Sequence, residues 1–466
     1  DMPEAISGRR FSYLGPEAVL FQGTIFDNIV YGLKHRPVGE AEYDAEGTLA
    51  RKAELSLARR TGSSLDDINA DWIDYSAANA AGPDDLEVQI LRVLKIVHLD
   101  RDVYSFGLRG RIDAENSPEL AEQFLEARTL MRELLHDQSM TDLIEAFDPE
   151  IYNRNASIGE NLLFGTPVGD RFQERNLAGD PYIREVLRTS KLRRALLQMG
   201  VTIAETMIEI FAGLPPGHEL FEQFSFISSD DLGEYEKIIA RWHSSGHDSM
   251  GRDDRRMLLS LPFVYVEPRH RLGLLDDEVR DKIVVARKYF AENITATDHS
   301  FVEFYNPELY NSEASLQDNV LFGRVGHGQS GAQAKVEKLI SDVFDKLGLR
   351  DEIYHVGLRY NVGSGGKQLS AVQRVQTALA RVMLKRPDLL ILNEATSVLN
   401  ERLEKDILSR IREDRKDFGV ISVLKSPEMA EEFDYIAYLE EGRLVEQGSP
   451  EELKTKKGAF AAMLAA

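Results

Sequence analysis

Residues 363–400 constrain the fold more than any other stretch, because they read GSGGKQLSAVQRVQTALARVMLKRPDLLILNEATSVLN. The glycines predict a turn, and Ser370 is suited to cap the helix that follows. Apolar residues recur at helical spacing until a proline ends that helix. Residues 389–392 are an unbroken apolar run, which is typical of a parallel strand buried on both faces. Asn393 and Glu394 follow the strand, at the edge where open α/β sheets bind ligands.

The order of these elements leads to a family resemblance. The chain carries LSAVQR at residues 369–374, which resembles the signature motif of ABC transporter nucleotide-binding domains. It carries ILNEATSVLN at 391–400, which resembles their Walker B strand and D-loop, and YLEEGRLVEQGSPEEL at 438–453, which resembles their C-terminal strand, hairpin and helix. The resemblance covers residues 301–466 and implies an α/β fold of the P-loop NTPase-like ABC ATPase type.

One sequence frame occurs three times along the chain. Residues 10–32 resemble the Q-loop region of ABC exporters, and the same frame returns at 147–165 and 305–323. Aligned on Asn28, Asn161 and Asn319, all three copies place Pro-Glu twelve and eleven residues earlier. All three copies also place an aromatic residue and a glycine three and four residues later. Below, these segments are the first, second and third copies.

A second repeat links the two ends of the chain, because residues 93–109 match residues 343–359 without a gap. An amphipathic helix at 118–135 then stands where the third copy has its signature helix. The sequence therefore predicts three ABC-like units. They comprise 1–146, with a Q-loop-like element, an acidic insertion and a helical subdomain; 147–300, which is divergent; and 301–466, with the signature, Walker B, D-loop and H-loop positions.

Two segments are predicted from composition and periodicity alone. Residues 41–85 are rich in Ala, Asp, Glu and Ser, and are either an exposed helical insertion or partly disordered. In the middle unit, spacing predicts helices at 181–199 and 201–211. Residues 261–268, with prolines near both ends, are interpreted as a strand that could be a decayed Walker B strand.

A phosphate-binding P-loop needs GxxxxGK[ST], and no stretch of this sequence fits that pattern. Residues 363–368, GSGGKQ, are too short and place Gln368 where the magnesium-binding hydroxyl would stand, so we interpret them as a turn. In the resembled family the Walker A loop precedes the Q-loop. We therefore expect this incomplete ABC fold to be a segment of a longer polypeptide, with Walker A before Asp1.

The resemblance carries residue roles onto five positions. It implies a general-base role for Glu394, with a relic acid at a strand end as the alternative. It implies nucleotide contacts for Ser370, Gln373, Asn393 and Lys425. Asn393 replaces the Walker B aspartate, and a neutral amide coordinates Mg²⁺ more weakly than a carboxylate does. Lys425 replaces the switch histidine, which it can copy only as a point charge.

Other positions of the catalytic motifs are altered as well. Ala371 and Val372 replace the signature glycines, and their side chains hinder close approach of the backbone to a phosphate. The Q-loop glutamine aligns with Pro16, Pro149 and Pro307, which offer no side-chain donor. We therefore expect this segment alone not to hydrolyse ATP. ATP and Mg²⁺ are expected as cofactors of the full-length protein, and the segment by itself is compatible with having none.

Composition and resemblance together indicate partners. A net charge of −22 argues against nucleic acid, because phosphate neutralisation needs a basic face. The sequence has no cysteine, and the spacing of His243 and His247 lies in a Ser/Gly-rich loop, so no metal site is predicted. The resemblance implies transmembrane domains and a second nucleotide-binding domain as partners, at the cytoplasmic face of the inner (plasma) membrane.

Two hypotheses of function follow, and a third is disfavoured. The first is a cytosolic ATP-binding region of an ABC exporter, largely degenerate. The alternative is a non-catalytic scaffold or regulatory module that has kept the fold without the nucleotide. A chromosome-structure or repair ATPase is disfavoured, because the sequence has no long coiled-coil heptads.

Overall fold

The computed structural model describes residues 4–137, 140–211, 227, 230–245, 250–327, 331–415, 418–456 and 458–464. It divides into two compact units, which we call the sheet unit (Asp1–Gly107 with Tyr354–Ala466) and the inserted unit (Leu108–Ile353). The chain passes between them within α5 (Asp100–Arg109) and α19 (Arg350–Leu358), the two helices of the gapless sequence repeat. The three ABC-like units at 1–146, 147–300 and 301–466 were predicted from sequence repeats. They remain a prediction about the repeats and are separate from the division into two compact units.

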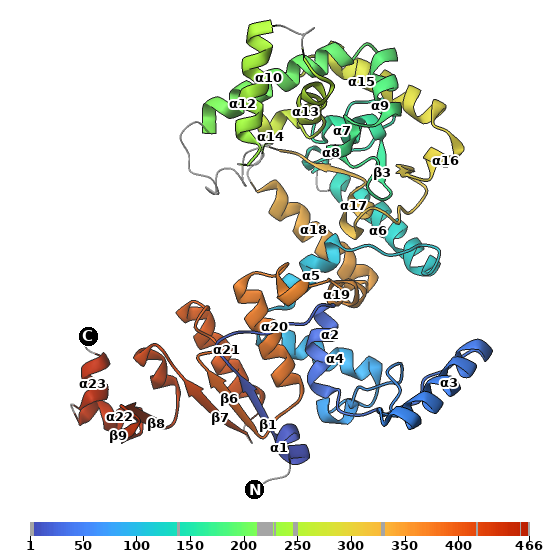
Figure 1. Cartoon of the computed structure of the whole chain (residues 1–466). Helices are drawn as coiled ribbons and strands as arrows, with labels where there is room; N and C mark the ends of the chain where they lie inside the picture. Colours follow the sequence, from blue (N-terminus) through green and yellow to red (C-terminus); the bar gives the residue numbers. More distant parts are fainter. Residues whose placement is uncertain are drawn as a thin grey trace. The chain divides into compact units, whose positions relative to one another are not determined.

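The sheet unit is mixed α/β (Figure 1). Besides parts of α5 and α19, it contains α1 (Glu4–Arg10), β1 (Phe11–Leu14), α2 (Ile25–Val30), η1 (Tyr31–Leu33), α3 (Ala45–Thr61), η2 (Tyr75–Ala78), α4 (Pro83–Ile96), η5 (Ser364–Gly366), α20 (Ala371–Leu384), β6 (Leu389–Asn393), α21 (Glu401–Asp414), β7 (Gly419–Val423), η6 (Pro427–Glu432), β8 (Ile436–Glu440), β9 (Arg443–Gly448), α22 (Pro450–Thr455) and α23 (Ala459–Leu464). Helix α3 covers residues 45–61 of the insertion predicted at 41–85, so the helical alternative is confirmed for that part of it.

A parallel sheet in the order β1-β6-β7 forms the centre of the sheet unit (Figure 1). The predicted strand at 389–392 is confirmed as β6, which pairs with β1 on one side and β7 on the other. Ser370 caps α20 as predicted, because its side chain accepts the N–H of Gln373. The preceding glycines form the predicted turn, with positive φ at Gly363, Gly365 and Gly366. Strand order therefore brings the carboxyl ends of β6 and β7 to one edge.

The inserted unit is mostly helical. Besides the remaining parts of α5 and α19, it contains α6 (Pro118–Asp137), η3 (Thr141–Leu143), β2 (Ile144–Ala146), α7 (Ile158–Leu163), β3 (Gly165–Pro167), α8 (Glu174–Leu177), α9 (Pro181–Thr189), α10 (Arg193–Phe211), α12 (Leu232–Ser245), α13 (Arg252–Phe263), α14 (Glu267–His270), α15 (Asp277–Asn293), α16 (Ala296–His299), β4 (Val302–Phe304), α17 (Leu316–Leu321), β5 (Gly323–Val325) and α18 (Ala332–Leu347). The loop expected around His243 is wrong at that residue, because His243 lies in α12; His247 lies outside the described residues.

Two predictions for the middle unit differ from the structure. The strand predicted at 261–268 is wrong, because α13 runs through Pro262 to Phe263 and α14 starts at Glu267. Its apolar residues are buried by helix packing against α10, where a Cβ at Gly200 would lie 2.0 Å from the Leu258 carbonyl oxygen. The helix predicted at 181–199 breaks at Lys191, whose φ of 56° is left-handed, and a single helix then continues to Phe211.

The second and third copies pair with each other inside the inserted unit. Strand β2, before the second copy, pairs antiparallel with β5, after the third, and β4, before the third, pairs with β3, after the second. The rings of Phe147 and Tyr305 stack at the centre, 4.1 Å apart. Gly165 and Gly323 allow this approach, since a Cβ at either would lie 2.6 or 2.5 Å from a carbonyl oxygen of the facing strand.

Each copy docks on one long helix through the same contact, which we call the Arg–Asn clamp. In it an arginine Nε donates to the backbone oxygen of the copy's asparagine, and Nη2 donates to its Oδ1. The clamps are Arg381 with Asn28, Arg287 with Asn161, and Arg128 with Asn319. The helices are α20, α15 and α6 in that order.

The clamps reveal an exchange between the first and third copies. Helix α6 follows the first copy in sequence but clamps the third, and α20 follows the third copy but clamps the first. A second contact repeats this exchange, because the Leu316 N–H donates to the Gly110 oxygen and the Ile25 N–H donates to the Tyr360 oxygen, at 2.9 and 3.0 Å. The inserted unit thus interrupts the sheet unit between the first copy and its own clamping helix.

Candidate functional site

The carboxyl edge of the parallel sheet brings together two of the predicted site residues. Glu394 follows β6 and Lys425 follows β7, and the Lys425 Nζ lies 3.3 Å from the Glu394 Oε2. The Glu394 N–H also donates to the Val423 oxygen at 3.1 Å, which holds the backbone against β7. Glu394 has a φ of 51°, an uncommon conformation for a residue with a side chain. The chain therefore turns sharply here and presents the carboxylate at the strand end.

Asn393 lies next to this pair but uses its side chain elsewhere. Its Nδ2 donates to the Tyr13 hydroxyl oxygen at 3.0 Å, which links the end of β6 to the end of β1. Tyr13 is 60% exposed, so this link lies on the surface of the sheet edge. The amide that replaces the expected carboxylate thus ties two strands together.

A cavity of about 200 Å³ opens at this edge. Its charged residues are Glu394, Glu401, Glu404 and Lys425. Three carboxylates against one lysine give it a negative potential, which repels a triphosphate. Within the described residues no group of acidic or histidine side chains has the arrangement of a metal site. The side chains present here therefore do not fit Mg²⁺ with a bound nucleotide.

Ser370 and Gln373 are engaged in the start of α20. The Ser370 Oγ accepts the Gln373 N–H at 3.2 Å, and the Gln373 Oε1 accepts the Ser370 N–H at 2.9 Å. The Gln373 Nε2 donates to the Asp102 Oδ1 at 2.6 Å. In the part of the chain that the structure describes, no hydrogen bond joins these two residues to Glu394, Asn393 or Lys425. The five predicted residues therefore form two separate groups.

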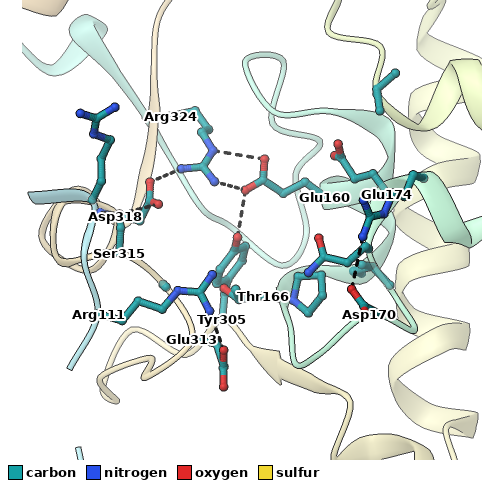
Figure 2. A pocket seen from close by; sticks show the side chains of 18 residues that line it. Arg111, Glu160, Thr166, Asp170, Glu174, Tyr305, Glu313, Ser315, Asp318 and Arg324 are labelled. Atoms are coloured by element: carbon teal, nitrogen blue, oxygen red, sulfur yellow. Dashed lines mark hydrogen bonds and ion pairs between the residues drawn. The ribbon is translucent and has the colours of Figure 1, made fainter. Parts of the chain in front are cut away.

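A larger cavity, of about 740 Å³, lies in the inserted unit between the second and third copies (Figure 2). Arg324 pairs there with Glu160 and Asp318, the acidic residues that end the first turns of α7 and α17. The Tyr305 hydroxyl donates to the Glu160 Oε1 at 2.9 Å. Burial opposes a charge on Arg324, but the two carboxylates raise its pKa.

This second site was missed from the sequence, although two signals were present. Glu160 and Asp318 occupy the same place in the repeated frame, and Arg324 follows the glycine that closes the third copy. Thr166 stands at the place of Arg324 in the second copy, so the pairing is one-sided. Because its charges satisfy one another, the Arg324 network holds the two copies together and leaves little free charge for a ligand.

Known proteins resemble part of this chain. No protein-family model matches it. A stretch of 205 residues is 31% identical to the β-(1→2)glucan export ATP-binding/permease protein NdvA of Rhizobium meliloti (strain 1021). The aligned stretch covers 43% of this chain and 32% of that protein. The ATM1-type heavy metal exporter of Novosphingobium aromaticivorans is 34% identical over 157 residues, 32% of this chain and 25% of that protein. Part of this chain is related to ABC exporters.

The chain spans about a third or less of the length of these ABC exporters. The ATP-dependent lipid A-core flippase of Xanthomonas axonopodis pv. citri is 33% identical over 153 residues, 24% of its length. A solved structure of a bacterial Atm1-family ABC exporter with ATP bound matches with 34% identity and a TM-score of 0.23, over 26% of this chain and 22% of that one. Among the described helices of this chain, none is both long and apolar enough to cross a membrane.

Proposed function

We propose that this chain is part of the ATP-binding region of an ABC exporter and that its own catalytic edge is degenerate. The relation of part of the chain to ABC exporters supports the family role. The observation that carries the degeneracy is the sheet edge, where Glu394 pairs with Lys425 and Asn393 binds Tyr13. ATP and Mg²⁺ then belong to the full-length protein, as does any second nucleotide-binding domain.

The edge explains why this chain would not hydrolyse ATP by itself. A general base acts only when it is positioned against a water molecule beside bound phosphate. Glu394 is instead held by the Lys425 ammonium, and its neighbouring carboxylates Glu401 and Glu404 repel phosphate. Asn393 supplies an amide in place of a metal-binding carboxylate. The site thus lacks both the free base and the charge balance that phosphoryl transfer needs.

The first copy supports a role in contacting transmembrane domains. Val19, Phe21 and Tyr31 are 62%, 42% and 52% exposed, and the rings of Phe21 and Tyr31 lie 4.4 Å apart. At the place of Tyr31 the third copy has Phe322, which is only 6% exposed. Exposed aromatic residues grouped in this way mark interaction surfaces. We assign this surface to the transmembrane partner, at the cytoplasmic face of the membrane.

Titration with a fluorescent ATP analogue, with and without Mg²⁺, tests the proposal. We expect no Mg²⁺-dependent turnover by the 466-residue chain and nucleotide binding by the full-length exporter. Turnover by the 466-residue chain would contradict the degeneracy. Absence of Mg²⁺-dependent nucleotide binding by both proteins would favour the scaffold alternative, which the occupied side chains of Asn393 and Glu394 also support.

A further inference from the structure

A cavity of about 460 Å³ in the inserted unit is lined by arginines from three helices. Arg184 comes from α9, Arg193 from α10, and the others from the first turns of α13. Its charged lining residues are Arg184, Arg193, Arg252, Asp253, Arg255 and Arg256. Five arginines against one aspartate make this a strongly positive cavity in a chain whose net charge is −22.

Most of these arginines have no ion pair with a residue that the structure describes. The Arg256 Nη2 lies 3.3 Å from the Asp253 Oδ1, on the same helix. Among the described residues, Arg184 and Arg255 have no ion pair, and the Nε of each is buried without a hydrogen-bond acceptor. Buried N–H groups normally have a partner, and an unpaired one costs free energy. The cavity is therefore lined by guanidinium groups whose positive charge is balanced, among the described lining residues, by Asp253 alone.

The arginines of the other two clusters in the inserted unit behave differently. Arg287 of the Arg–Asn clamp fills its donors with backbone carbonyls, and Arg324 is paired with two carboxylates. The five arginines that line this cavity have no comparable set of described partners, since the one carboxylate among them is Asp253. Like charges brought together with so little counter-charge repel one another, and a bound anion relieves that repulsion.

The start of α13 adds to the positive potential. Its N-cap residue, Gly251, offers no side chain to the free N–H groups of the first turn. The positive end of the helix dipole therefore faces the same region as Arg252, Arg255 and Arg256. This arrangement suits an anion with several oxygen atoms, because guanidinium groups bind phosphate oxygens in pairs.

We propose that this cavity binds a small molecule that carries two or more phosphate groups. A single orthophosphate engages two or three arginines, whereas the cavity offers five. Its volume of about 460 Å³ lies within the range of small-molecule sites. Ala178, Gly179 and Leu259 complete the lining, which contains no aromatic ring to stack on a base. The cavity therefore recognises the phosphate groups of its ligand. These belong either to an inorganic polyphosphate or to the phosphate chain of a nucleotide.

Calorimetric titration of the 466-residue chain tests this site. Tripolyphosphate, pyrophosphate, ATP with EDTA and orthophosphate are compared at low and moderate salt. We expect tripolyphosphate to bind at one site per chain and at least tenfold more tightly than orthophosphate. Equal affinity of ATP and tripolyphosphate identifies the phosphate chain as the recognised part, and tighter binding of ATP identifies a nucleotide as the ligand.

Matched glutamine variants locate the binding. Arg184→Gln and Arg255→Gln are each expected to weaken tripolyphosphate binding about tenfold, because each removes one of the five positive charges of the lining. The controls are Arg188→Gln, on α9 next to the exposed Glu185, and Arg194→Gln, beside Arg193 on α10. Neither control residue lines the cavity, and both controls should change the affinity less than twofold.

The Tm of each variant, measured without ligand, shows whether the substitution damages the fold. Removing one of several unpaired like charges should raise Tm by about 2 °C, whereas loss of a structural arginine would lower it. Tripolyphosphate should raise the Tm of the unaltered chain more than that of the Arg184→Gln variant at the same ligand concentration. Absence of binding, or equal weakening by Arg188→Gln, overturns the proposal. It leaves the proposed exporter role intact, since the cavity belongs to the inserted unit and the sheet edge to the sheet unit.

Discussion

The first copy of the repeated frame and the other two copies use the same clamp in different surroundings. In the second copy, the Arg287 Nη1 donates to the oxygens of Asp148, Pro149 and Ile151 at 2.9, 2.9 and 3.1 Å. The third copy repeats this set around Arg128, at the equivalent positions 306, 307 and 309. In the first copy the Arg381 Nη1 reaches only the Val19 oxygen. All three clamps therefore share the two contacts with the asparagine. The clamp of the first copy has fewer contacts with loop carbonyls than the other two.

A single position accounts for much of this difference. Asp148 and Asn306 each accept the N–H of the residue two positions later, at 2.7 and 2.9 Å, and so form a turn that aims carbonyls at the arginine. The first copy has Gly15 at that place, which has no side chain to form the turn. Its preceding strand, β1, is a member of the parallel sheet, whereas β2 and β4 pair with the neighbouring copy.

The comparison teaches that one frame can serve two purposes. Where two copies face each other, the aromatic residue before the closing glycine of the third copy, Phe322, is covered, with 6% exposure. Where one copy follows the sheet, its equivalent surface stays open, with Tyr31 at 52%. The inserted pair is thus a closed structural element, and the first copy keeps the exposed surface for which we propose a partner.

The largest expected effect is the loss of a clamp in the inserted unit. Arg287→Met should lower the free energy of unfolding by about 3–5 kcal/mol, because Arg287 is 3% exposed and its loss leaves several buried oxygens without donors. Burial lowers the pKa of Arg287 to about 10, so the side chain is still charged at neutral pH. Urea unfolding measures the change.

Lys288→Met is the matched control for that clamp. Lys288 is the next residue on α15 and forms an exposed pair with Glu150, so its loss should cost less than about 0.5 kcal/mol. A similar loss for both variants would mean that general helix stability, and not the clamp, holds the second copy.

The clamp of the sheet unit should be weaker. Arg381→Met is expected to cost about 1–3 kcal/mol, because Arg381 is only partly buried and has a single loop carbonyl as a partner besides Asn28. Hydrogen exchange of the α2 amides measures the local loss. If Arg381→Met destabilises as strongly as Arg287→Met, the reduced loop contacts are energetically irrelevant.

Replacing the turn residue Asp148 should have a smaller effect on the free energy of unfolding than the loss of either clamp. Asp148→Gly, which copies the first copy, is expected to cost about 1 kcal/mol, because it removes the side-chain acceptor and adds backbone freedom. Asp148→Asn is the control, since Asn306 shows that an amide oxygen fulfils the same role. The protection of the Glu150 amide against exchange should fall only in the glycine variant.

Local sequence patterns predicted many of the elements of this fold. They did not predict which helix packs against which copy of the repeated frame. The cap at Ser370, strand β6 and the three copies could be read from spacing and repeats. The exchange of α6 and α20 could not, because both helices follow the same Tyr-x-x-Gly-Leu-Arg pattern and carry an arginine that fits either copy. Within the sheet unit, Gly357 lies so close to the Val103 oxygen that a Cβ would be 2.0 Å away.

The candidate site shows the same limit. Sequence placed Glu394 and Lys425 at strand ends, and the parallel order of β6 and β7 brings them together. It could not show that Asn393 binds Tyr13 or that Ser370 and Gln373 satisfy each other, because such contacts depend on rotamers and on neighbours far along the chain. The unpaired arginines around Arg184 gave no sequence signal, since they come from three helices.

The smallest expected effect concerns the sheet edge itself. Lys425 is 62% exposed at its side chain and Glu394 is 38% exposed, so their ion pair is screened by solvent. Lys425→Ala should therefore change the free energy of unfolding by less than about 0.5 kcal/mol. The same small change is expected for Lys454→Ala, which breaks a comparable pair with Glu431 elsewhere in the sheet unit.

Freeing Glu394 should not produce Mg²⁺-dependent ATP turnover either, because Asn393 still offers an amide and the cavity still holds three carboxylates. Turnover gained by Lys425→Ala alone would show that the lysine is the only block at this edge, which would make the sheet unit a suppressed enzyme and not a degenerate one.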